Sequence, residues 1–544
     1  MYDVAIVGGG PVGMLLAAEL ALQGVRPVVL ERLAVPSGES KAGTLHARTA
    51  QSLDRRGLLH RVGRASYDNV LFHFSGMFGL DLGAVVGEGP VIVGSPQAWA
   101  EQVFADRALE LGAEIRRGQE VTGLVQHADH VTLTLAGSPG GEASPVAAGR
   151  VDGTAPVAAG SADGAAPFAA GSVDGTPLAA GRVGGASAFA AGSVGGTPLF
   201  AAGSVGDASL DARYVVGTDG ARSVVRKAAG IPFVGSGARV AALMGEVRLP
   251  PDVPGGWHRT PRGWLMVWAR PGGHSRVTTY DYRGPHPDRE APVTLEELQE
   301  AASYIAGEPI LMSDPRLLSR YGDAALQAES YRSGRVLLAG DAAHVHFPWG
   351  GQGLNTGLED AFNLGWKLAA EVRGRAPAGL LDTYHAERHP VGARVLWNVR
   401  AQNALAHPDP ALDPLRELFA ELMEFPQVNE YLSGMISGVD TRYSGFGMAP
   451  DIEVKTPDGA VRLASLLHSG RPLYVDLASR DDLVAVVEGR VDVVRGVASS
   501  PSPWVGLLIR PDGYLAWETT GSVSEALSHE DALSLEKAVT HWFG

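Results

Sequence analysis

The chain has no cysteine among its 544 residues. Disulfide bonds, thiolate metal ligands and thiol redox chemistry are therefore excluded. It also lacks an apolar run of about 18 residues, the length that a membrane-spanning helix needs. No signal peptide precedes the first strand-like segment, which begins at Tyr2. We therefore expect a soluble, cytoplasmic protein.

Positive charge is scarce. The 60 aspartate and glutamate residues outnumber the 45 lysine and arginine residues, and the net charge is -15. This balance argues against nucleic acid or an anionic membrane as the main partner. The charge says nothing about self-association, so a homodimer is left open. The length is enough for two or three domains, and 45% apolar residues is ordinary for a globular protein.

Phrases typical of hydrolytic enzymes are also absent. The chain contains no Gly-x-Ser-x-Gly nucleophile phrase and no His-Glu-x-x-His zinc phrase. His344 and His346 could form a metal pair, but no third ligand lies near them in the sequence, and we expect no metal. These absences fit an enzyme in which a bound cofactor carries the chemistry.

Between residues 146 and 210 the sequence is repetitive and poor in large apolar residues. A unit of Ala-Ala-Gly-Ser or Ala-Ala-Gly-Arg recurs there every 10 or 11 residues. A regular period can indicate a solenoid, but units of Ala, Gly and Ser have too few large side chains to stack a core. We interpret 146–210 as a low-complexity insertion in a surface loop, between a strand over 131–135 and a segment that starts at Asp211. Such an insertion costs little closure entropy.

The first 31 residues follow the order strand, glycine-rich turn, helix, strand. In the turn, Gly8 permits a tight bend, Gly10 lets the backbone approach a pyrophosphate, and Gly13 lets the helix pack on the strand. The helix N-terminus offers unpaired N–H groups and the positive end of its dipole to phosphates. Glu31, at the end of the second strand, can accept hydrogen bonds from a ribose diol. The pattern predicts a dinucleotide site but does not separate FAD from NAD.

Two further motifs lie far along the chain. An apolar strand runs into Asp-Gly at 219–220, and another runs into Gly-Asp at 340–341. The second is followed by a glycine-rich turn over 351–355 that opens a helix. Asp219 and Asp341 could also be helix N-caps, and capping can coexist with a cofactor contact.

With these three separated motifs, the chain resembles the group A flavoprotein monooxygenases, the aromatic hydroxylases with the p-hydroxybenzoate hydroxylase fold. The resemblance covers nearly the whole chain outside the repeats. Within the family it is most similar to the hydroxylases of aromatic polyketides, which carry a C-terminal thioredoxin-like domain. The phrase Arg510-Pro-Asp-Gly-Tyr-Leu-Ala-Trp517 is similar to one that recurs in that domain. The domain usually has no redox cysteines, which agrees with their absence here.

The resemblance implies an α/β protein with a Rossmann-like FAD-binding domain, an interleaved β-sheet substrate domain and a C-terminal thioredoxin-like α/β domain. The expected FAD-binding domain spans 1–66, 101–234 and 331–400. The expected substrate domain spans 67–100 and 235–330, and is followed by a helical connector over 401–449 and the thioredoxin-like domain over 450–544.

The resemblance also implies which residues contact FAD: Gly8, Gly10, Pro11, Val12, Gly13, Glu31, Arg32, Arg48, Gln97, Asp219, Gly220, Gly340, Asp341, Pro348, Gly351, Gly353, Leu354 and Asn355. Asp341 would hydrogen-bond the ribityl chain. The N–H groups near Leu354 and Asn355 would face the flavin N1 and C2 carbonyl, where a helix N-terminus stabilises negative charge. Asp219 and Gly220 would serve the pyrophosphate region and transient NAD(P)H docking.

Arg32 would lie near the adenine, and Arg48 and Pro348 are candidates near the flavin ring, although no residue is assigned as a catalyst. Trp264, Trp268 and Trp349, together with Pro348, are candidates for the substrate pocket. The tryptophans of the middle segment could instead be sheet packing.

The implied reaction consumes O2 and NAD(P)H, by family habit NADPH rather than NADH, and proceeds through a flavin C4a-(hydro)peroxide. The expected substrate is an aromatic polyketide or a similar multi-ring compound in antibiotic or secondary-metabolite biosynthesis. Hydroxylation and Baeyer–Villiger insertion are both left open. The alternatives are an antibiotic-inactivating monooxygenase of the rifampicin or tetracycline type, a flavin-dependent reductase on the same fold, and a flavoprotein without enzymatic activity.

Overall fold

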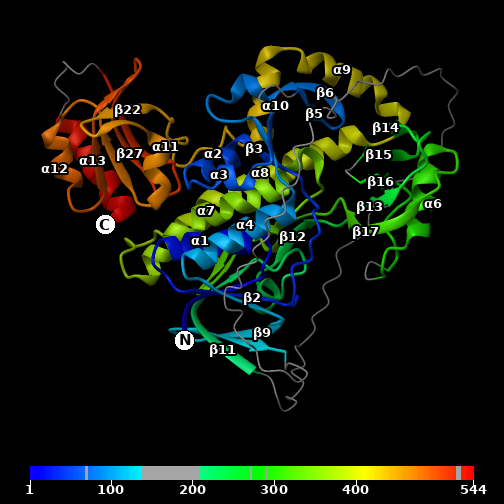
Figure 1. The fold of residues 1–544 in the computed structure, drawn as a ribbon, viewed down its shortest axis with the longest axis horizontal. Coiled ribbons are helices and arrows are strands. Elements are labelled where there is room, and N and C mark those ends of the chain that lie inside the picture. Colours follow the sequence, from blue (N-terminus) through cyan, green and yellow to red (C-terminus); the bar gives the residue numbers. More distant parts are fainter. Residues whose placement is uncertain (68–70, 137–207, 270–271, 289–290, 522–528) are drawn as a thin grey trace, which may run out of the picture.

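The computed structural model describes residues 1–67, 71–136, 208–269, 272–288, 291–521 and 529–544 (Figure 1). The repeats expected over 146–210 lie outside the described residues, except for the last three. Those three belong to strand β11, Ala208–Gly217, so the strand begins before Asp211. The reason is pairing: β10, Val131–Leu135, runs antiparallel to β11, and Leu133 lies opposite the buried Leu210.

The first layer is an eight-stranded sheet with the central order β19-β20-β11-β1-β2-β8, to which β10 and β9 add beside β11. Its strands β20, β11, β1, β2 and β8 are parallel. The strands not yet bounded are β1 Tyr2–Val7, β2 Pro27–Glu31, β8 Glu114–Arg117, β9 Val121–Gln126, β19 Arg332–Ser333 and β20 Val336–Leu338. Parallel strands buried on both faces read as continuous apolar runs, which is why β1, β2 and β20 were visible in the sequence.

Helices cover this sheet. Helix α1, Pro11–Leu22, packs against both α4, Gln97–Glu110, and α7, Gln352–Val372 (Figure 1). The first residues of α1 and α7 therefore meet at one edge of the sheet, where the parallel strands end. Ligands of α/β proteins bind at such edges.

The second layer is an antiparallel sheet with the order β14-β15-β16-β13-β17. Its strands are β13 Ala241–Arg248, β14 Gly256–Thr260, β15 Gly263–Ala269, β16 Ser275–Asp281 and β17 Ser313–Gly322. Helix α6, Leu295–Ala306, covers one face and packs on Leu265 and Val267 of β15. Trp264 and Met266 alternate with them and belong to an aromatic cluster on the opposite face.

Short elements join the two layers. They are β3 Thr44–His46, β4 Ala65–Tyr67, β5 Leu71–Phe74, β6 Met77–Asp81, β7 Ile92–Gly94, β12 Phe233–Ser236, β18 Ala325–Ala328 and β21 His344–Val345, with helices α2 Ala47–Asp54, α3 Leu59–Val62 and α5 Val224–Ala228.

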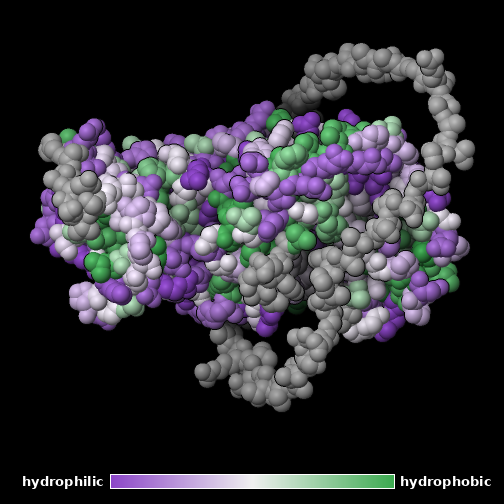
Figure 2. Space-filling view, turned by 90° about the horizontal axis from the view of Figure 1, so that it is seen from above, coloured by the Kyte–Doolittle hydropathy of each residue, from purple (hydrophilic) through white to green (hydrophobic). Residues whose placement is uncertain are grey.

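Three helices follow α7. They are α8 Asp382–Ala406, α9 Asp413–Met423 and α10 Pro426–Ser437. Helix α9 lies on the surface, and Leu415, Leu418 and Leu422 expose one apolar stripe along it. Figure 2, seen from the side on which α9 lies, shows apolar patches among polar residues.

The C-terminal unit is an α/β layer of its own, at the left of Figure 1. A sheet of order β25-β24-β27-β28 stands beside a smaller sheet of order β23-β22-β26. The elements are β22 Glu453–Thr456, β23 Gly459–Arg462, α11 Leu463–Leu466, β24 Leu473–Asp476, α12 Asp481–Val487, β25 Asp492–Arg495, β26 Val497–Ala498, β27 Trp504–Ile509, β28 Leu515–Thr520 and α13 His529–Phe543.

A buried ionic cluster joins this unit to α7 and α8. Arg510, with no exposed surface, donates to Glu387 of α8 at 2.6 Å and to Asp512 at 2.5 Å. Lys367 of α7 donates to the same Glu387 at 2.6 Å. Burial acts to raise the pKa of Glu387, but Arg510 and Lys367 outweigh it and hold that pKa at about 2. The cations thus keep this carboxylate charged inside the junction.

We expect Arg510→Met to lower the free energy of unfolding by about 3–5 kcal/mol, because it leaves Glu387 and Asp512 buried without their cation. Equilibrium denaturation in urea measures the change. The matched control is Arg480→Met, which breaks the partly exposed pair with Asp482 in the same unit, and should cost less than about 1 kcal/mol. Equal losses in the two variants would contradict the assignment of Arg510 as the junction residue.

Candidate active site

The glycine-rich turn after β1 is built by close backbone contacts. Gly8 has a φ of +109°, and a Cβ there would lie 2.5 Å from the carbonyl oxygen of Thr218. A Cβ at Gly13 would lie 2.1 Å from the carbonyl oxygen of Gly8, so α1 can approach the strand only because both positions are glycine. Gly10 differs, because a Cβ there would meet no atom within 4 Å. The open space beside Gly10 is the part of the turn that can accept a ligand.

The start of α1 leaves hydrogen-bond donors for that ligand. Gly10 is the N-cap residue, and no side chain caps the helix. Pro11 occupies the first helical turn, where its missing N–H removes no intrahelical bond. The next N–H groups have no partner within the helix, and such a helix end binds phosphate groups. The open space beside Gly10 and the first N–H groups of α1 form a cradle. This cradle therefore fits the phosphates of a dinucleotide.

Glu31 stands at the mouth of this cradle. Its Oε2 accepts the N–H of Gly9 at 2.7 Å, and its Oε1 accepts the N–H of Leu33 at 2.8 Å. These bonds fix the carboxylate, and its remaining lone pairs can accept ribose hydroxyls. Arg32, the next residue, is exposed beside it.

The Asp-Gly motif leads into a helix. Asp219 accepts the hydroxyl of Ser223 at 2.5 Å and the N–H of Val224 at 2.7 Å, at the start of α5. Gly220 has a φ of +81°, and no atom lies within 4 Å of where its Cβ would be. Asp219 therefore accepts the first N–H groups of α5, but it is not the N-cap, because Ser223 holds that position and its hydroxyl accepts the N–H of Arg226.

The Asp-Gly and Gly-Asp motifs are tied together. Arg226 of α5 donates to the carbonyl oxygen of Ala342 at 2.9 Å. Ala342 belongs to the turn that contains Gly340 and Asp341. A Cβ at Gly357 of α7 would lie 3.2 Å from the Cα of Gly340, so α7 packs directly on the turn. Motifs more than 100 residues apart in the sequence thus meet at one edge of the sheet.

Asp341 faces the open edge. Its side chain is exposed on one side and surrounded by protein atoms on the others. This partial burial raises the pKa of its carboxyl, while His344 and Lys41 act to lower it. A carboxyl in this position can hydrogen-bond a polyol chain laid along the edge.

Lys41 is a residue that the motifs did not reveal. It lies in the segment before β3, near enough to lower the pKa of Asp341, and its side chain is 59% exposed. Gln97, at the start of α4, accepts the N–H of Ala42 at 3.2 Å and so holds this segment. The only signal in the sequence was a single cation in a polar stretch, which no spacing rule singles out.

Asp360, inside α7, organises the turn at Gly340. Its Oδ2 accepts the N–H of Gly340 at 3.0 Å and lies 2.7 Å from Nε2 of His344, and its Oδ1 accepts Arg388 at 2.7 Å. Burial acts to raise the pKa of Asp360, but Arg388 and His344 outweigh it and hold that pKa below its usual value. His344 is therefore a structural partner of a carboxylate. Among the described residues no group of three or more metal-ligating side chains could hold a metal ion.

The N-terminus of α7 is set by a double glycine. Gly350 and Gly351 have φ values of +72° and +64°, and no side chain caps the helix. The side chain of Asn355 accepts the N–H of His46 at 2.8 Å and donates to the carbonyl oxygen of Gly351 at 3.0 Å. This arrangement leaves the first N–H groups of α7, near Gly353, able to meet a negatively charged ring edge.

Arg48 lies apart from the dinucleotide turn, and of the other predicted flavin residues only Asn355 lines the same cavity. Its guanidinium donates to the carbonyl oxygens of Gly438 and Val439, at 3.3 and 2.8 Å, and to Gln51 at 3.0 Å. These partners lie up to 391 residues along the chain, so the sequence motif could not indicate them. The side chain lines a cavity whose wall also includes Thr49 of α2 and Gln352 and Asn355 of α7.

The three candidate tryptophans belong to one aromatic cluster. The Trp349 ring lies 5.7 Å from Trp264 and 5.9 Å from Trp257, which in turn lies 5.8 Å from Trp268. Trp264 is buried and donates from Nε1 to Ala406, which fits the packing interpretation. Trp268 is only half-buried. Because Trp349 precedes α7, the cluster lies directly beside the turn at the α7 N-terminus.

Helices of the described part of the chain are too short or too polar to cross a membrane.

Comparisons with known proteins agree with this site. A family model described as an FAD binding domain matches residues 1–151 and 188–399. A second, described as the C-terminal part of aromatic-ring hydroxylases, matches residues 442–544.

Relatives match along the whole chain. A rifampicin monooxygenase from Streptomyces venezuelae is 38% identical, over 100% of this chain and 99% of its own. A 12-dehydrotetracycline 5-monooxygenase/anhydrotetracycline 6-monooxygenase from Streptomyces rimosus is 37% identical with the same coverage. The solved structure of OxyS anhydrotetracycline hydroxylase from Streptomyces rimosus has a TM-score of 0.80 at 36% identity, covering 100% of this chain and 99% of that one. These matches confirm the family and the α/β fold that the three motifs predicted.

The cradle gives a paired prediction. We expect Gly10→Ala to fold normally but to weaken FAD binding roughly tenfold or more, equivalent to about 1.4 kcal/mol, because its Cβ enters only the open space beside the turn. Gly13→Ala should instead lower the free energy of unfolding by about 1–3 kcal/mol through overpacking. Thermal unfolding of the apoprotein and FAD titration by fluorescence measure both. Unchanged FAD affinity in folded Gly10→Ala would place the phosphates elsewhere.

Proposed function

The chain belongs to the FAD-dependent aromatic-ring hydroxylases and is an FAD-dependent monooxygenase; we propose that it oxygenates a multi-ring aromatic compound of the polyketide type, in antibiotic or secondary-metabolite biosynthesis. Its substrates are an aromatic compound, O2 and reduced nicotinamide, and we propose NADPH for the last. The cytoplasm, which supplies reduced nicotinamide, is the proposed location.

The turn before α7 is the observation that carries the proposal. On one side, its glycines form the α7 N-terminus at the dinucleotide edge. On the other, Trp349 packs into the aromatic cluster of the antiparallel sheet. A planar ring held at this helix end would lie next to a surface suited to another aromatic ring.

We assign the following roles to the residues of the chain. Gly10 and the start of α1 hold the pyrophosphate, Glu31 holds the adenosine ribose, and Asp341 holds the ribityl chain. FAD, when bound, would accept a hydride from NAD(P)H and activate O2. The N-terminus of α7, near Gly353, stabilises negative charge at the edge of the ring. The aromatic cluster excludes water from the reacting face.

The rifampicin relative supports a second candidate, which is modification of a finished antibiotic. The two curated relatives are 38% and 37% identical to this chain, so identity does not separate the two roles. Parallel assays with anhydrotetracycline and rifampicin discriminate them, because turnover of only one compound assigns the substrate class.

The proposal predicts substrate-stimulated reduction. Mixed anaerobically with NADPH, the yellow protein should lose its 450 nm absorbance at least about tenfold faster when the correct multi-ring phenol is bound. Stopped-flow absorbance measures the rate, and NADH in place of NADPH tests the choice of nicotinamide. A protein that purifies colourless and binds no added FAD would refute the proposal.

The half-buried Trp268 should contact the substrate. We expect Trp268→Leu to raise KM for the aromatic substrate about fivefold, through loss of roughly 1 kcal/mol of ring contact, with little effect on stability. Trp264→Leu should instead lower the unfolding temperature, because it removes a buried ring and the bond to Ala406. Steady-state kinetics and thermal unfolding separate the two effects. An unchanged KM in Trp268→Leu would assign this ring to packing.

A further inference from the structure

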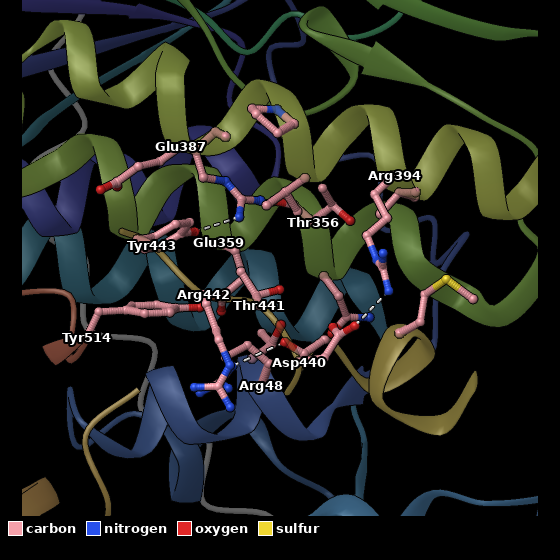
Figure 3. Close-up of a pocket in the computed structure, with 18 of the residues that line it drawn as sticks. Arg48, Thr356, Glu359, Glu387, Arg394, Asp440, Thr441, Arg442, Tyr443 and Tyr514 are labelled. Carbon is pink, nitrogen blue, oxygen red and sulfur yellow. Dashed lines mark hydrogen bonds and ion pairs between the residues drawn. The ribbon is translucent and has the colours of Figure 1, made fainter. Parts of the chain in front are cut away.

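A cavity of about 580 Å³ lies where the C-terminal unit meets α7 and α8 (Figure 3). Its walls come from α2, α7, α8, the end of α10, the loop over 438–444 and residues of the C-terminal unit. The glycines of the dinucleotide turn, Glu31 and Asp341 do not line it, and neither do the tryptophans of the aromatic cluster. The cavity therefore lies away from the dinucleotide turn, and it shares only Asn355, at the start of α7, with the proposed active site.

Four buried polar atoms of the cavity wall have no hydrogen-bond partner in the described part of the chain. They are Oγ1 of Thr49, Nε2 of Gln352, Oε1 of Glu359 and the hydroxyl of Tyr514. These side chains are only 1%, 3%, 7% and 2% exposed, in that order. Buried polar groups are normally paired, so four unpaired groups around one cavity indicate a ligand with complementary groups.

The charge of the wall favours an anion. Arg48, 6% exposed, donates three hydrogen bonds to uncharged acceptors, which leaves guanidinium N–H groups unused. Among the described residues, no carboxylate lies within ion-pairing distance of Arg48. In contrast, Arg394 pairs with Asp440 at 3.0 Å, as Figure 3 shows. A buried cation without a paired anion is unfavourable, and an anionic ligand would balance it.

Glu359 adds an acceptor. Its side chain extends from α7 and lies between Tyr443 and Thr441 (Figure 3). Burial raises the pKa of Glu359 to about 7, although Arg388 and Arg48 act to lower it. Near neutral pH the carboxyl is therefore partly protonated, and it cancels the charge of the arginine only in part. Ser52 also acts on this carboxyl, and its remaining lone pairs can accept a hydroxyl of the ligand.

One part of the wall is apolar, although polar side chains such as Thr383, Thr441 and His541 also line the cavity. This part is made by Pro390, Val391 and Val395 of α8 and by Met435 and Ile436 of α10. Flat aromatic rings fill such a slot without leaving polar atoms unpaired.

We propose that this cavity is a second binding site, for an aromatic compound that carries an ionised acid beside a hydroxyl group. Arg48 holds the anion, and Thr49 and Tyr514 donate to it. Glu359 accepts the ligand hydroxyl, and the apolar residues of α8 and α10 hold the ring. The site needs the C-terminal unit, which supplies Tyr514, and it does not depend on the proposed reaction.

Calorimetric titration of the FAD-loaded enzyme with 1-hydroxy-2-naphthoate tests the site. Tyr514→Phe and Thr49→Val each remove one unpaired hydroxyl and should weaken the binding event in the cavity about three- to tenfold. Tyr474→Phe is the matched control, because its hydroxyl is also buried and unpaired but lies in the C-terminal sheet; it should titrate like the wild type. 1-Naphthol, which lacks the acid, should bind at least about tenfold more weakly.

Identical titrations of the wild type and both cavity variants would overturn the proposal and leave ordered water as the partner of these atoms. Equal affinities for 1-naphthol and the acid would overturn the anionic assignment. If NADP+ displaces the probe from the cavity, the assignment of an aromatic acid as the ligand is wrong, and the ligand is instead a dinucleotide. Unfolding temperatures of the variants within about 2 °C of the wild type, as expected for a removed hydroxyl, keep the comparison valid. The rate of FAD reduction by NADPH is measured in a different experiment. Failure of the second binding site and failure of the proposed function can therefore be told apart.

Discussion

The active-site edge depends on one buried carboxylate, that of Asp360. An isolated buried charge is strongly unfavourable, and this one is stabilised by Arg388, His344 and the N–H of Gly340. The same three contacts bind α7 to α8, to β21 and to the turn that carries Asp341. Together with the packing of α7 on α1, these contacts fix the start of α7 beside the turn that carries Asp341.

The network continues from this carboxylate into the C-terminal unit. Arg388 also donates to the hydroxyl of Tyr443 at 2.8 Å, and the ring of Tyr443 lies 4.3 Å from that of Tyr514. Arg510 and Glu387 form a second connection beside it. The C-terminal unit of this chain has no cysteine and so no thiol chemistry to perform. It contacts α8 through Arg510 and contributes Tyr514 to the second cavity.

Local patterns in the sequence predicted much of this architecture. The apolar strand, the spaced glycines and Glu31 identified the first edge because all of them lie within 31 residues and each has a steric or hydrogen-bonding reason. The sequence could not indicate contacts made across hundreds of residues. The motif around Arg48 predicts a place near the flavin, and this stays a prediction; the carbonyl oxygens that Arg48 contacts, those of Gly438 and Val439, lie 390 and 391 residues further along the chain. Asp360 was visible only as an acid in a helix, because the partners that define its role lie on other elements.

Transfer of oxygen from O2 into an aromatic substrate is the central claim, and isotope labelling tests it most directly. The FAD-loaded enzyme would be supplied with NADPH, anhydrotetracycline and 18O2, and the product analysed by mass spectrometry. A monooxygenase places one labelled oxygen atom in the product. A product that gains two hydrogens and no label, or consumption of NADPH that yields only labelled hydrogen peroxide with this and with other multi-ring aromatic compounds, would contradict the claim.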